Sequence, residues 1–382
     1  MHITYCIPSL YNSGGMERVL TLKANYLVDV LGWSVSIITT SQKERPPFYE
    51  LSPQVHLVDL GVDYELISDF PIIKKIMARR RAAIKHKRKL GLLLREIKPD
   101  ITVSMFTHEM AFLPTIKDGS RKVLELHFSK KFRILDATSK NMGGFKRFIL
   151  NIAQWRDNRA IKHYDRFVVL TDMDAHDWKM SNINVIPNPT PFEQSPLCDY
   201  ESKRILAVGR FCPQKGFDML VRAWSLIPRS IRQGWHIDIV GSGPYENQLR
   251  TLIIDSHMEN TIHLCQPSKN ISSIYASHSV FCFPSRYEGF PMTLLEAESH
   301  GLPAIAFDCP CGPSDLIKDN DNGFLVKLGD VSSFADKMAK LICSVSLRKR
   351  LGTKAQAYVL NNYTQNHVMQ QWQDLFCRVI KK

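Results

Sequence analysis

Two glutamates, Glu288 and Glu296, stand in a segment whose residue order can bind an anionic ligand. An apolar run ends at residue 283, a short polar turn carries Glu288, and Pro291 opens a segment predicted to be helical to about residue 300. A buried parallel strand followed by such a loop and helix places unpaired backbone N–H groups at the carboxyl edge of the sheet. Glu296 is predicted to lie roughly 7–8 Å along the helix axis. The segment therefore predicts a site for an anion of nucleotide size.

Two cations lie near the end of another predicted strand, residues 204–210. Arg210 ends that strand and Lys215 lies five residues further on, in a loop before a helix, so both could reach a diphosphate. The alternative interpretation is a pair of solvated loop charges. Gly14 and Gly15 supply a tight turn at a predicted helix start, which either binds a phosphate through its N–H groups or simply connects a strand to a helix.

A second pair of glycines, Gly241 and Gly243, also follows a predicted strand. Their run VGSGP lacks the third glycine of a dinucleotide fingerprint, so on its own it is a weak signal. Gln266 ends the next predicted strand. We take these three residues as candidates for loops around a nucleotide base.

Predicted strands and helices alternate along the 382 residues, a length that favours two domains. This alternation predicts an α/β fold with parallel sheets and helices on both faces. Residues 187–197 contain four prolines with little periodicity and are interpreted as a linker. We predict a first domain at 1–190, a second domain at 200–363, and an amphipathic helix at 364–380 that packs back on the first domain. Strands are predicted at 1–10, 33–40, 55–61, 101–106, 123–128, 166–172, 184–189, 204–210, 236–244, 261–266, 280–285 and 304–308.

The composition is that of a folded protein with reduced thiols. No apolar run approaches the 18 or so residues of a membrane-spanning helix, and the start of the chain lacks a signal-peptide pattern. The cysteines are odd in number, nine, and the one close pair, Cys309 and Cys311, has no second pair at metal-ligand spacing. We expect free, mostly buried thiols in a reducing compartment and therefore a cytoplasmic protein.

A basic segment at residues 74–89 carries nine of the Lys and Arg residues and no acid. Without those nine charges the net charge of +13 would be +4, so the basic character is largely local. A solvated helix face is one interpretation, because Ile73, Ile76, Met77 and Ile84 keep helical spacing. Attachment to an anionic membrane surface is the favoured one. Nucleic-acid binding is the third, and we expect none, because no recognition module accompanies the charge.

Further basic residues could extend that surface. They lie outside the segment, in the second half of the first predicted domain, and comprise Lys130, Lys131, Arg133, Lys146 and Arg147.

The motifs together resemble the retaining nucleotide-sugar glycosyltransferases of family 4. Glu288 and Glu296, with seven residues between them, match that family's E-x7-E signature, and the likeness is strongest over residues 205–330. The segments that carry the resemblance are SGGMER, GRFCPQKG, VGSGP, FPSRYEGFPMTLLEA and GLPAIAF. The resemblance implies the GT-B fold, two doubly wound Rossmann-like domains facing each other across a cleft. It also implies that the domain at 1–190 binds the acceptor and that the domain at 200–363 binds the nucleotide sugar.

For the second domain, the resemblance implies a role for each matching residue. Glu296 would bind the donor ribose, and Arg210 and Lys215 would neutralise the donor diphosphate in place of a metal, so no metal and no cofactor are expected. Glu288 would hold the donor sugar as a catalytic residue. The backbone N–H groups of the segment after it would bind sugar and phosphate, with Gly289, Phe290 and Met292 as the named candidates.

For the first domain, the resemblance implies three further positions. Gly15 would cap the diphosphate, and His127 would lie near the reacting sugar as a second catalytic residue. Asn188 matches a recurrent position, although a turn role is equally consistent with its sequence. Without the resemblance, a lone histidine at a strand end is more often structural.

The predicted function is transfer of a hexose or N-acetylhexosamine, with retention, from a nucleotide sugar such as a UDP-sugar to a polyprenyl-diphosphate-linked glycan. The motifs most resemble capsule, exopolysaccharide and O-antigen enzymes, which implies a peripheral protein on the inner face of the cell membrane. Two alternatives stay open. One is another GT-B activity such as a nucleotide-sugar epimerase, and the other is a basic membrane-surface binding protein without activity.

Overall fold

The computed structural model describes residues 1–67, 71–130 and 144–381, which divide into two compact α/β units. Among these residues, unit 1 comprises 1–127, 144–187 and 369–381, and unit 2 comprises 128–130 and 188–368. Of the possible basic extensions, Lys131 and Arg133 lie outside the described residues, as do the side chains of Lys146 and Arg147.

Unit 1 is built on a parallel sheet in the order β3-β2-β1-β4-β5-β6-β7. The register runs from His2 opposite Ser34 to Ile7 opposite Thr39 at the centre. The strands are β1 (His2–Ile7), β2 (Ser34–Thr39), β3 (His56–Asp59), β4 (Ile101–Ser104), β5 (Arg121–Glu125), β6 (Arg166–Val169) and β7 (Ile183–Val185). The helices are α1 (Gly15–Asp29), α2 (Ile72–Ile97), α4 (Gly144–Ile161), α5 (Asp172–Trp178) and α14 (Gln365–Ile380), with short 3₁₀ turns η1 (Glu65–Ile67) and η2 (Leu113–Thr115).

Unit 2 repeats the same topology in a parallel sheet, ordered β10-β9-β8-β11-β12-β13. Its strands are β8 (Arg204–Val208), β9 (His236–Val240), β10 (Ile262–Cys265), β11 (Val280–Phe283), β12 (Ala304–Asp308) and β13 (Gly323–Lys327). Its helical elements are η3 (Pro213–Lys215), α6 (Phe217–Leu226), α7 (Arg229–Arg232), α8 (Glu246–Asp255), α9 (Ile271–Ala276), α10 (Met292–Ser299), α11 (Pro313–Leu316), α12 (Val331–Cys343) and α13 (Val345–Asn362).

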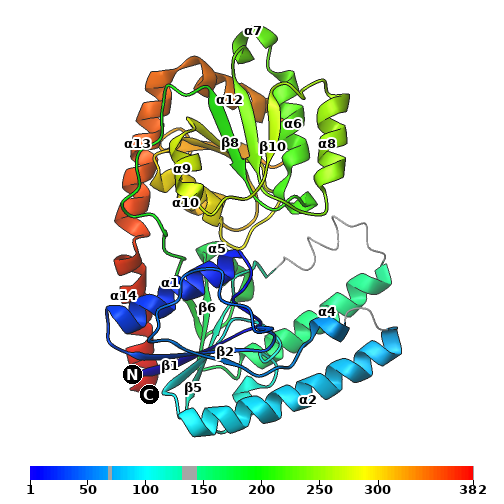
Figure 1. Ribbon diagram of the computed structural model, residues 1–382, viewed down its shortest axis with the longest axis vertical. Helices are drawn as coiled ribbons and strands as arrows, with labels where there is room; N and C mark the ends of the chain where they lie inside the picture. The colour runs from blue at the N-terminus through cyan, green and yellow to red at the C-terminus, as the bar shows by residue number, and fades with distance from the viewer. Residues whose placement is uncertain (68–70, 131–143, 382) are drawn as a thin grey trace. The chain divides into compact units, whose positions relative to one another are not determined.

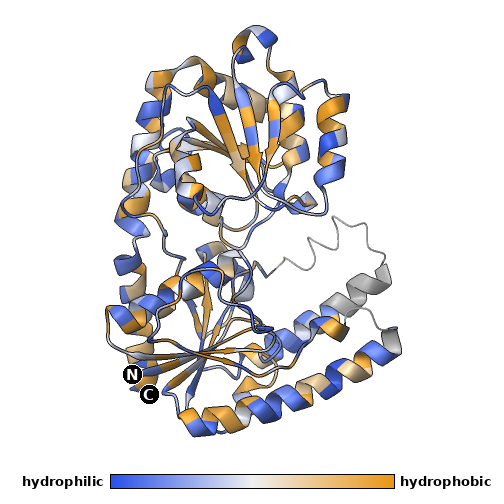
Figure 2. Cartoon of the chain, in the orientation of Figure 1, coloured by the Kyte–Doolittle hydropathy of each residue, from blue (hydrophilic) through white to orange (hydrophobic). Residues whose placement is uncertain are grey.

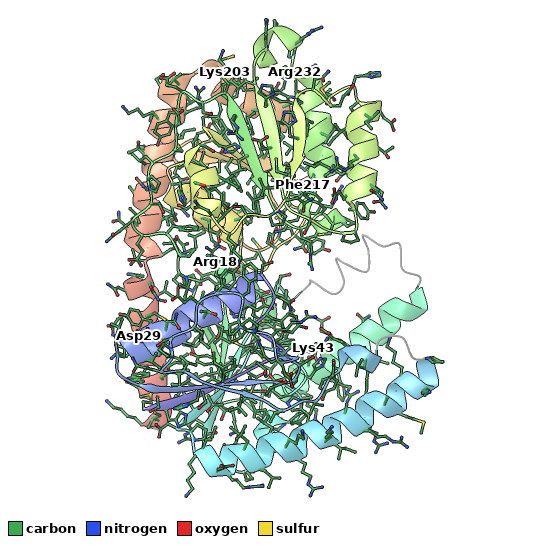
Figure 3. All side chains as sticks on the ribbon, in the orientation of Figure 1. Arg18, Asp29, Lys43, Lys203, Phe217 and Arg232 are labelled. Carbon is green, nitrogen blue, oxygen red and sulfur yellow. The ribbon has the colours of Figure 1, made fainter. Side chains whose placement is uncertain are left out.

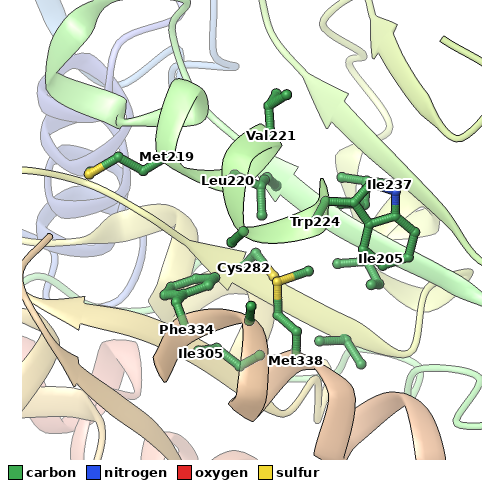
Figure 4. Packing of buried hydrophobic residues seen from close by; sticks show 14 of the residues in the cluster. Ile205, Met219, Leu220, Val221, Trp224, Ile237, Cys282, Ile305, Phe334 and Met338 are labelled. Atoms are coloured by element: carbon green, nitrogen blue, oxygen red, sulfur yellow. The ribbon is translucent and has the colours of Figure 1, made fainter. Parts of the chain in front are cut away.

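Two groups of helices cover the sheet of unit 2. Helices α6, α8 and α12 contact one another, and α10, α11 and α13 form a second contacting group (Figure 1). Right-handed crossovers on either side of β8 place the two groups on opposite faces. Between α6, α12 and the strands lies a core that includes Trp224, Cys282, Ile305, Phe334 and Met338, all buried (Figure 4). The α/β prediction is confirmed for both units.

The sequence predictions for individual elements differ from the structure in three places. Strand β13 was missed, and β8 ends at Val208, so Arg210 lies in the following loop. Pro291 is the residue before the first turn of α10, because its carbonyl accepts from the N–H groups of Leu294 and Leu295 at 3.0 Å. Helix α14 begins at Gln365, and its apolar face is buried; this face comprises Val368, Trp372, Leu375, Phe376 and Val379.

Chain colouring by hydropathy shows that the strands of both sheets are largely apolar, whereas hydrophilic and hydrophobic segments alternate along α2 (Figure 2). Strands buried on both faces by helices are expected to be apolar throughout. Among the side chains of α2 that the structure describes, the buried ones are those of His86, Leu90 and Leu94, all in its second half. All nine cysteines lie within the described residues and are free thiols, including the buried pair Cys309 and Cys311.

Candidate functional site

The strand order of unit 2 reverses between β8 and β11, which lie side by side while their connections run in opposite directions. In open parallel sheets, ligands bind at such a point, outside the carboxyl ends of the strands. Phe217 lies at this edge of the unit, and Lys203 and Arg232 lie at the opposite edge (Figure 3). The loops that follow β8 and β11 carry Lys215 and Glu288, so topology alone brings these two predicted residues together.

Lys215 and Glu288 form an ion pair at the reversal point, with Nζ 2.8 Å from Oε1. The Glu288 side chain is 6% exposed and that of Lys215 is 18% exposed. Gly216 allows this approach, because at its φ of +65° a Cβ atom would lie 2.0 Å from the carbonyl oxygen of Pro284. The two loops are therefore in backbone contact beside the ion pair.

Arg286 ties the same two loops together, and the sequence reasoning did not single it out. Its guanidinium donates to both carboxylate oxygens of Asp218 at 2.8 Å and to the carbonyl of Pro213 at 2.6 Å. Its backbone N–H donates to Gln214, at 2.8 Å. Burial alone would raise the pKa of Asp218, but the hydrogen bond and charge of Arg286 lower it. Because bidentate Arg–carboxylate pairs are geometrically specific, this contact fixes the loops that carry Lys215 and Glu288.

The N-terminus of α10 presents backbone donors beside Glu288. In the described part of the chain, the N–H groups of Gly289, Phe290 and Thr293 meet no acceptor. Met292 is different from the prediction, because its N–H already donates to the carbonyl of Phe290 at 3.0 Å. The available donors at this helix end are therefore Gly289, Phe290 and Thr293, where the helix dipole favours negative charge.

Glu296 lies one turn along α10 and is buried. The hydroxyl of Tyr275 donates to its Oε2 at 2.9 Å. Its backbone carbonyl lies 2.7 Å from Nδ1 of His300, whose ring stacks on Tyr275 with centroids 5.1 Å apart. Aromatic neighbours thus hold both the carboxylate and the helix end that carries it.

The remaining predicted residues of unit 2 lie in the loops after β8, β9 and β10 and at the start of the unit. Arg210 and Gln266 are exposed in the loops after β8 and β10, and Asn188 is buried at the start of the unit. A Cβ atom on Gly241 would lie 1.9 Å from the carbonyl oxygen of Gly209, so the loop after β9 packs directly on the loop after β8. Gly243, at a φ of +155°, packs on the same loop. A packing role explains both glycines, and their place at a nucleotide base stays a prediction.

In unit 1, Gly15 is the first residue of α1 and is exposed. The carboxylate of Glu17 folds back over Gly14, since a Cβ atom on Gly14 would lie 2.1 Å from Oε2 of Glu17. Burial raises the pKa of Glu17, with the charge of His127 acting in the opposite direction. An acidic side chain therefore lies at the helix end where a diphosphate is predicted to bind.

His127 follows β5, and its Nε2 lies 3.0 Å from Oε1 of Glu125. The other oxygen of Glu125 meets Nζ of Lys23 at 2.6 Å. The sequence reasoning missed both partners. A signal was present, because Lys23 interrupts the apolar face of a helix and Glu125 interrupts an apolar strand, and charged residues at such positions are rarely buried without a partner.

The basic segment lies on α2, where eight of its nine basic residues are exposed and Lys75 is half-buried. The apolar side chains that keep helical spacing in the first half of α2 are not buried where the structure describes them. Ile76, Met77 and Ile84 are 63%, 53% and 64% exposed, and the side chain of Ile73 lies outside the described residues. Exposed apolar side chains also occur on α4, at Ile152 and Trp155.

The described residues offer neither a metal-binding cluster nor a membrane-spanning helix. Within residues 1–67, 71–130 and 144–381, no group of three or more His, Cys, Asp and Glu side chains is placed to hold a metal ion. No helix in those ranges is both long and apolar enough to cross a bilayer.

Comparison with known sequences identifies relatives over the whole chain. The family described as Glycosyl transferases group 1 matches residues 191–358. The amylovoran biosynthesis glycosyltransferase AmsD of Erwinia amylovora is 36% identical, over 97% of this chain and 97% of its own length. A Campylobacter jejuni enzyme is 24% identical over 99% of both chains; its name is GalNAc-alpha-(1->4)-GalNAc-alpha-(1->3)-diNAcBac-PP-undecaprenol alpha-1,4-N-acetyl-D-galactosaminyltransferase.

Comparison with solved structures shows the fold. A mutant of TarM from S. aureus, crystallised with Fondaparinux, alpha-GlcNAc-glycerol and UDP, matches with a TM-score of 0.77 at 16% identity. The match covers 98% of this chain and 99% of TarM. The fold is therefore the GT-B type, with two Rossmann-like domains.

Proposed function

Because this chain belongs to the group 1 glycosyl transferases, we propose that it transfers a hexose or N-acetylhexosamine from a UDP-sugar to a lipid-linked glycan in the assembly of surface polysaccharide. Membership of the family makes the chain a glycosyltransferase. The Erwinia relative supports a role in polysaccharide synthesis, and the Campylobacter relative, whose name includes PP-undecaprenol, supports a polyprenyl-diphosphate-linked acceptor. The complex of TarM with UDP supports the donor.

The observation that carries the proposal is the Lys215–Glu288 pair beside the free N–H groups of α10. In the proposed reaction, the bond between the anomeric carbon and the β-phosphate oxygen breaks, and negative charge grows on the departing diphosphate. Lys215, Arg210 and the N–H groups of Gly289 and Phe290 would stabilise that charge, with no metal required. Glu296, eight residues after Glu288, would bind the ribose.

The proposed stereochemistry is retention by displacement on one face of the sugar. The acceptor oxygen bonds to the anomeric carbon on the side from which the diphosphate departs, and a phosphate oxygen takes the acceptor's proton. Glu288 is engaged by Lys215 and is proposed to hold the sugar instead of attacking it. His127 is proposed to orient the sugar, and Gly15 to bind the diphosphate.

The test is release of nucleoside diphosphate from a panel of nucleotide sugars, with and without a short polyprenyl-diphosphate-linked glycan. We expect acceptor-dependent UDP release for a single UDP-sugar, without added metal and in the presence of EDTA. Product analysis by NMR should show an anomeric configuration equal to that of the donor. An inverted product would overturn the proposed stereochemistry, and absence of release with every UDP-sugar would overturn the donor.

The lipid-linked acceptor also implies a place for the protein at the inner face of the cell membrane, as a peripheral protein. Helix α2 supports this, because its exposed basic residues alternate with exposed Ile76, Met77 and Ile84. Apolar side chains that enter the headgroup region beside Lys and Arg are typical of helices that lie on a membrane. Exposed Trp155 on α4 adds an aromatic side chain of the kind enriched at that depth.

Liposome flotation tests the membrane proposal. Each basic residue near an anionic surface contributes about 1 kcal/mol, so changing Arg79, Arg80, Arg81 and Lys85 to Gln should lower binding by about 100-fold or more. The matched control removes four exposed basic residues of unit 2, Lys327, Lys340, Lys349 and Arg350. Equal loss in both variants, or no flotation of the native protein with anionic lipid at low salt, would end the proposal.

A further inference from the structure

A buried ion pair lies inside unit 1, between Lys23 of α1 and Glu125, the last residue of β5. Nζ of Lys23 lies 2.6 Å from Oε2 of Glu125, and the two side chains are 0% and 1% exposed. Two aromatic rings enclose the ammonium group, that of Trp372 at 3.5 Å from Nζ and that of Tyr5 at 5.3 Å. The lysine charge is therefore held on three sides by groups that favour a cation.

Stability alone does not account for such a pair. Removing two charges from water costs several kcal/mol per ion, and well-packed apolar residues of similar volume often stabilise a core as well or better. A function for the pair should therefore appear in what it touches. Glu125 is the member with a further contact, because its second oxygen accepts from His127.

The two oxygens of Glu125 have separate partners, Lys23 on Oε2 and His127 on Oε1. Burial alone would raise the pKa of Glu125, but the charges and hydrogen bonds of Lys23 and His127 outweigh it and lower the pKa to about 2. At neutral pH the group is therefore a carboxylate, which can only accept hydrogen bonds.

An acceptor at Nε2 fixes the protonation pattern of the histidine ring. Nε2 must carry the proton to make the 3.0 Å contact, so in the neutral imidazole Nδ1 is an acceptor. The His127 side chain is only 5% exposed, and it also interacts with the charge of Glu17, whose carboxyl lies over Gly14. The residue thus lies between one carboxylate bonded to its ring and a second at the start of α1.

We propose that Lys23 and Glu125 are positioning residues for His127, holding its ring so that Nδ1 accepts a hydrogen bond from a hydroxyl of the donor sugar. This inference rests on the proposed function, because it takes His127 as a residue that contacts the sugar. It adds a buried pair, 102 residues apart in sequence, whose charge sets the tautomer and orientation of that histidine.

The test uses the double variant Lys23→Met with Glu125→Gln, which removes both charges while keeping side-chain volume. A neutral amide can accept from or donate to the ring, so the tautomer of His127 is no longer fixed. In NMR spectra of labelled histidine, the ring nitrogens of His127 should lose the signature of an imidazole protonated only at Nε2 and show a mixture of tautomers. The turnover number kcat should fall about tenfold or more, because reacting groups are no longer aligned, with KM for the donor changed less than about threefold.

The matched control is Lys122→Met with Asp118→Asn, a second largely buried Lys–acid pair of unit 1 whose members make no recorded contact with His127. This control should leave both the tautomer signature of His127 and kcat at the native values. An unchanged tautomer signature and kcat in the test variant would overturn the proposal and leave the pair with a packing role. Normal turnover of His127→Ala would also overturn it, and UDP release by the native protein would then show that the proposed function itself stands.

Discussion

Both units contain a Lys–Glu pair next to residues predicted to act on the substrate, and the two pairs differ in burial. Lys23 and Glu125 are shut off from solvent and enclosed by aromatic rings. Lys215 is 18% exposed, lies in a loop, and shares the edge of its sheet with free backbone donors. Water and dissolved anions do not reach Lys23 or Glu125, so neither residue can exchange its partner. Lys215 is partly exposed and can exchange Glu288 for an incoming anion.

This difference assigns the pairs different physical tasks. A fully buried pair is costly to break, because each charge left alone faces a medium of low dielectric constant. It is therefore suited to holding a geometry. A partly exposed pair loses less when separated, and Lys215 would regain a negative partner when a diphosphate arrives. The Lys215–Glu288 pair is therefore suited to separating when an anionic ligand binds.

The comparison breaks most directly at Glu288. Changing Glu288 to Ala should lower kcat by about 100- to 1,000-fold, the cost of losing one preorganised group that acts on the reacting centre. The dissociation constant for UDP should stay within about threefold, because Lys215 and the helix N-terminus remain. UDP release and calorimetric titration measure the two quantities. Near-normal turnover would remove Glu288 from the site, and Glu246→Ala, a partly exposed carboxylate paired with Arg250, is the control.

The two lysines offer the second test. Lys23→Met leaves the Glu125 charge buried and should lower the free energy of unfolding by about 3–5 kcal/mol. Lys215→Met should cost only about 1–3 kcal/mol, because Glu288 stays near the positive end of α10. Urea denaturation monitored for each variant gives the numbers. Equal losses of unfolding free energy in the two variants would contradict the distinction between a pair that holds a geometry and a pair that separates on ligand binding.

A buried carboxyl without a cation sharpens the comparison further. Glu298 on α10 is fully buried, and neither of its oxygens has a hydrogen-bond partner in the described part of the chain. Burial raises its pKa well above the ordinary value of 4.5, so the folded protein keeps the proton that the unfolded chain loses. Stability due to this group is therefore present below about pH 4.5 and is lost as the pH rises.

Glu298→Gln should accordingly match the native protein at pH 4 and be the more stable of the two at pH 8. A gain of about 1 kcal/mol would raise Tm by about 2–4 °C, which differential scanning calorimetry resolves. Glu246, which is partly exposed and paired with Arg250, should show no such divergence with pH when it is changed to Gln. A Glu298→Gln protein less stable than the native one at pH 8 would mean that the carboxylate has a charged partner.

The sequence predicted the local order of the candidate site well. A strand ending near residue 283, a polar loop and a helix from about residue 291 follow from Pro291 and the apolar run before it, and the structure has β11 and α10 there. The parallel sheets followed from the alternation of strands and helices. Strand β13 was missed because its five residues follow a run of turn-forming residues and precede a glycine, so they gave too short a signal.

Contacts between residues far apart in the chain could not be predicted from the sequence pattern. Lys23 and Glu125 are each an isolated charge in an apolar stretch, and nothing local tells which charge pairs with which over 102 residues. Arg286 is similar, because its bidentate contact with Asp218 depends on how two loops meet. The contact of Met292 is local but was also not expected, since a tight turn to Phe290 uses the N–H that a helix start would otherwise leave open. The place of Met292 at the donor stays a prediction.

The centre of the Trp372 ring lies 3.5 Å from the ammonium group of Lys23. This contact affects the order in which the two units can finish folding during synthesis. The ribosome synthesises residues 1–127 first. The ring of Trp372, which completes the enclosure of Lys23, is synthesised only near the end of the chain. Domains generally fold as units while the chain emerges, so residues 188–368 can complete a core earlier than unit 1. The first-made domain would thus finish folding last, and until then its buried lysine stays in contact with water.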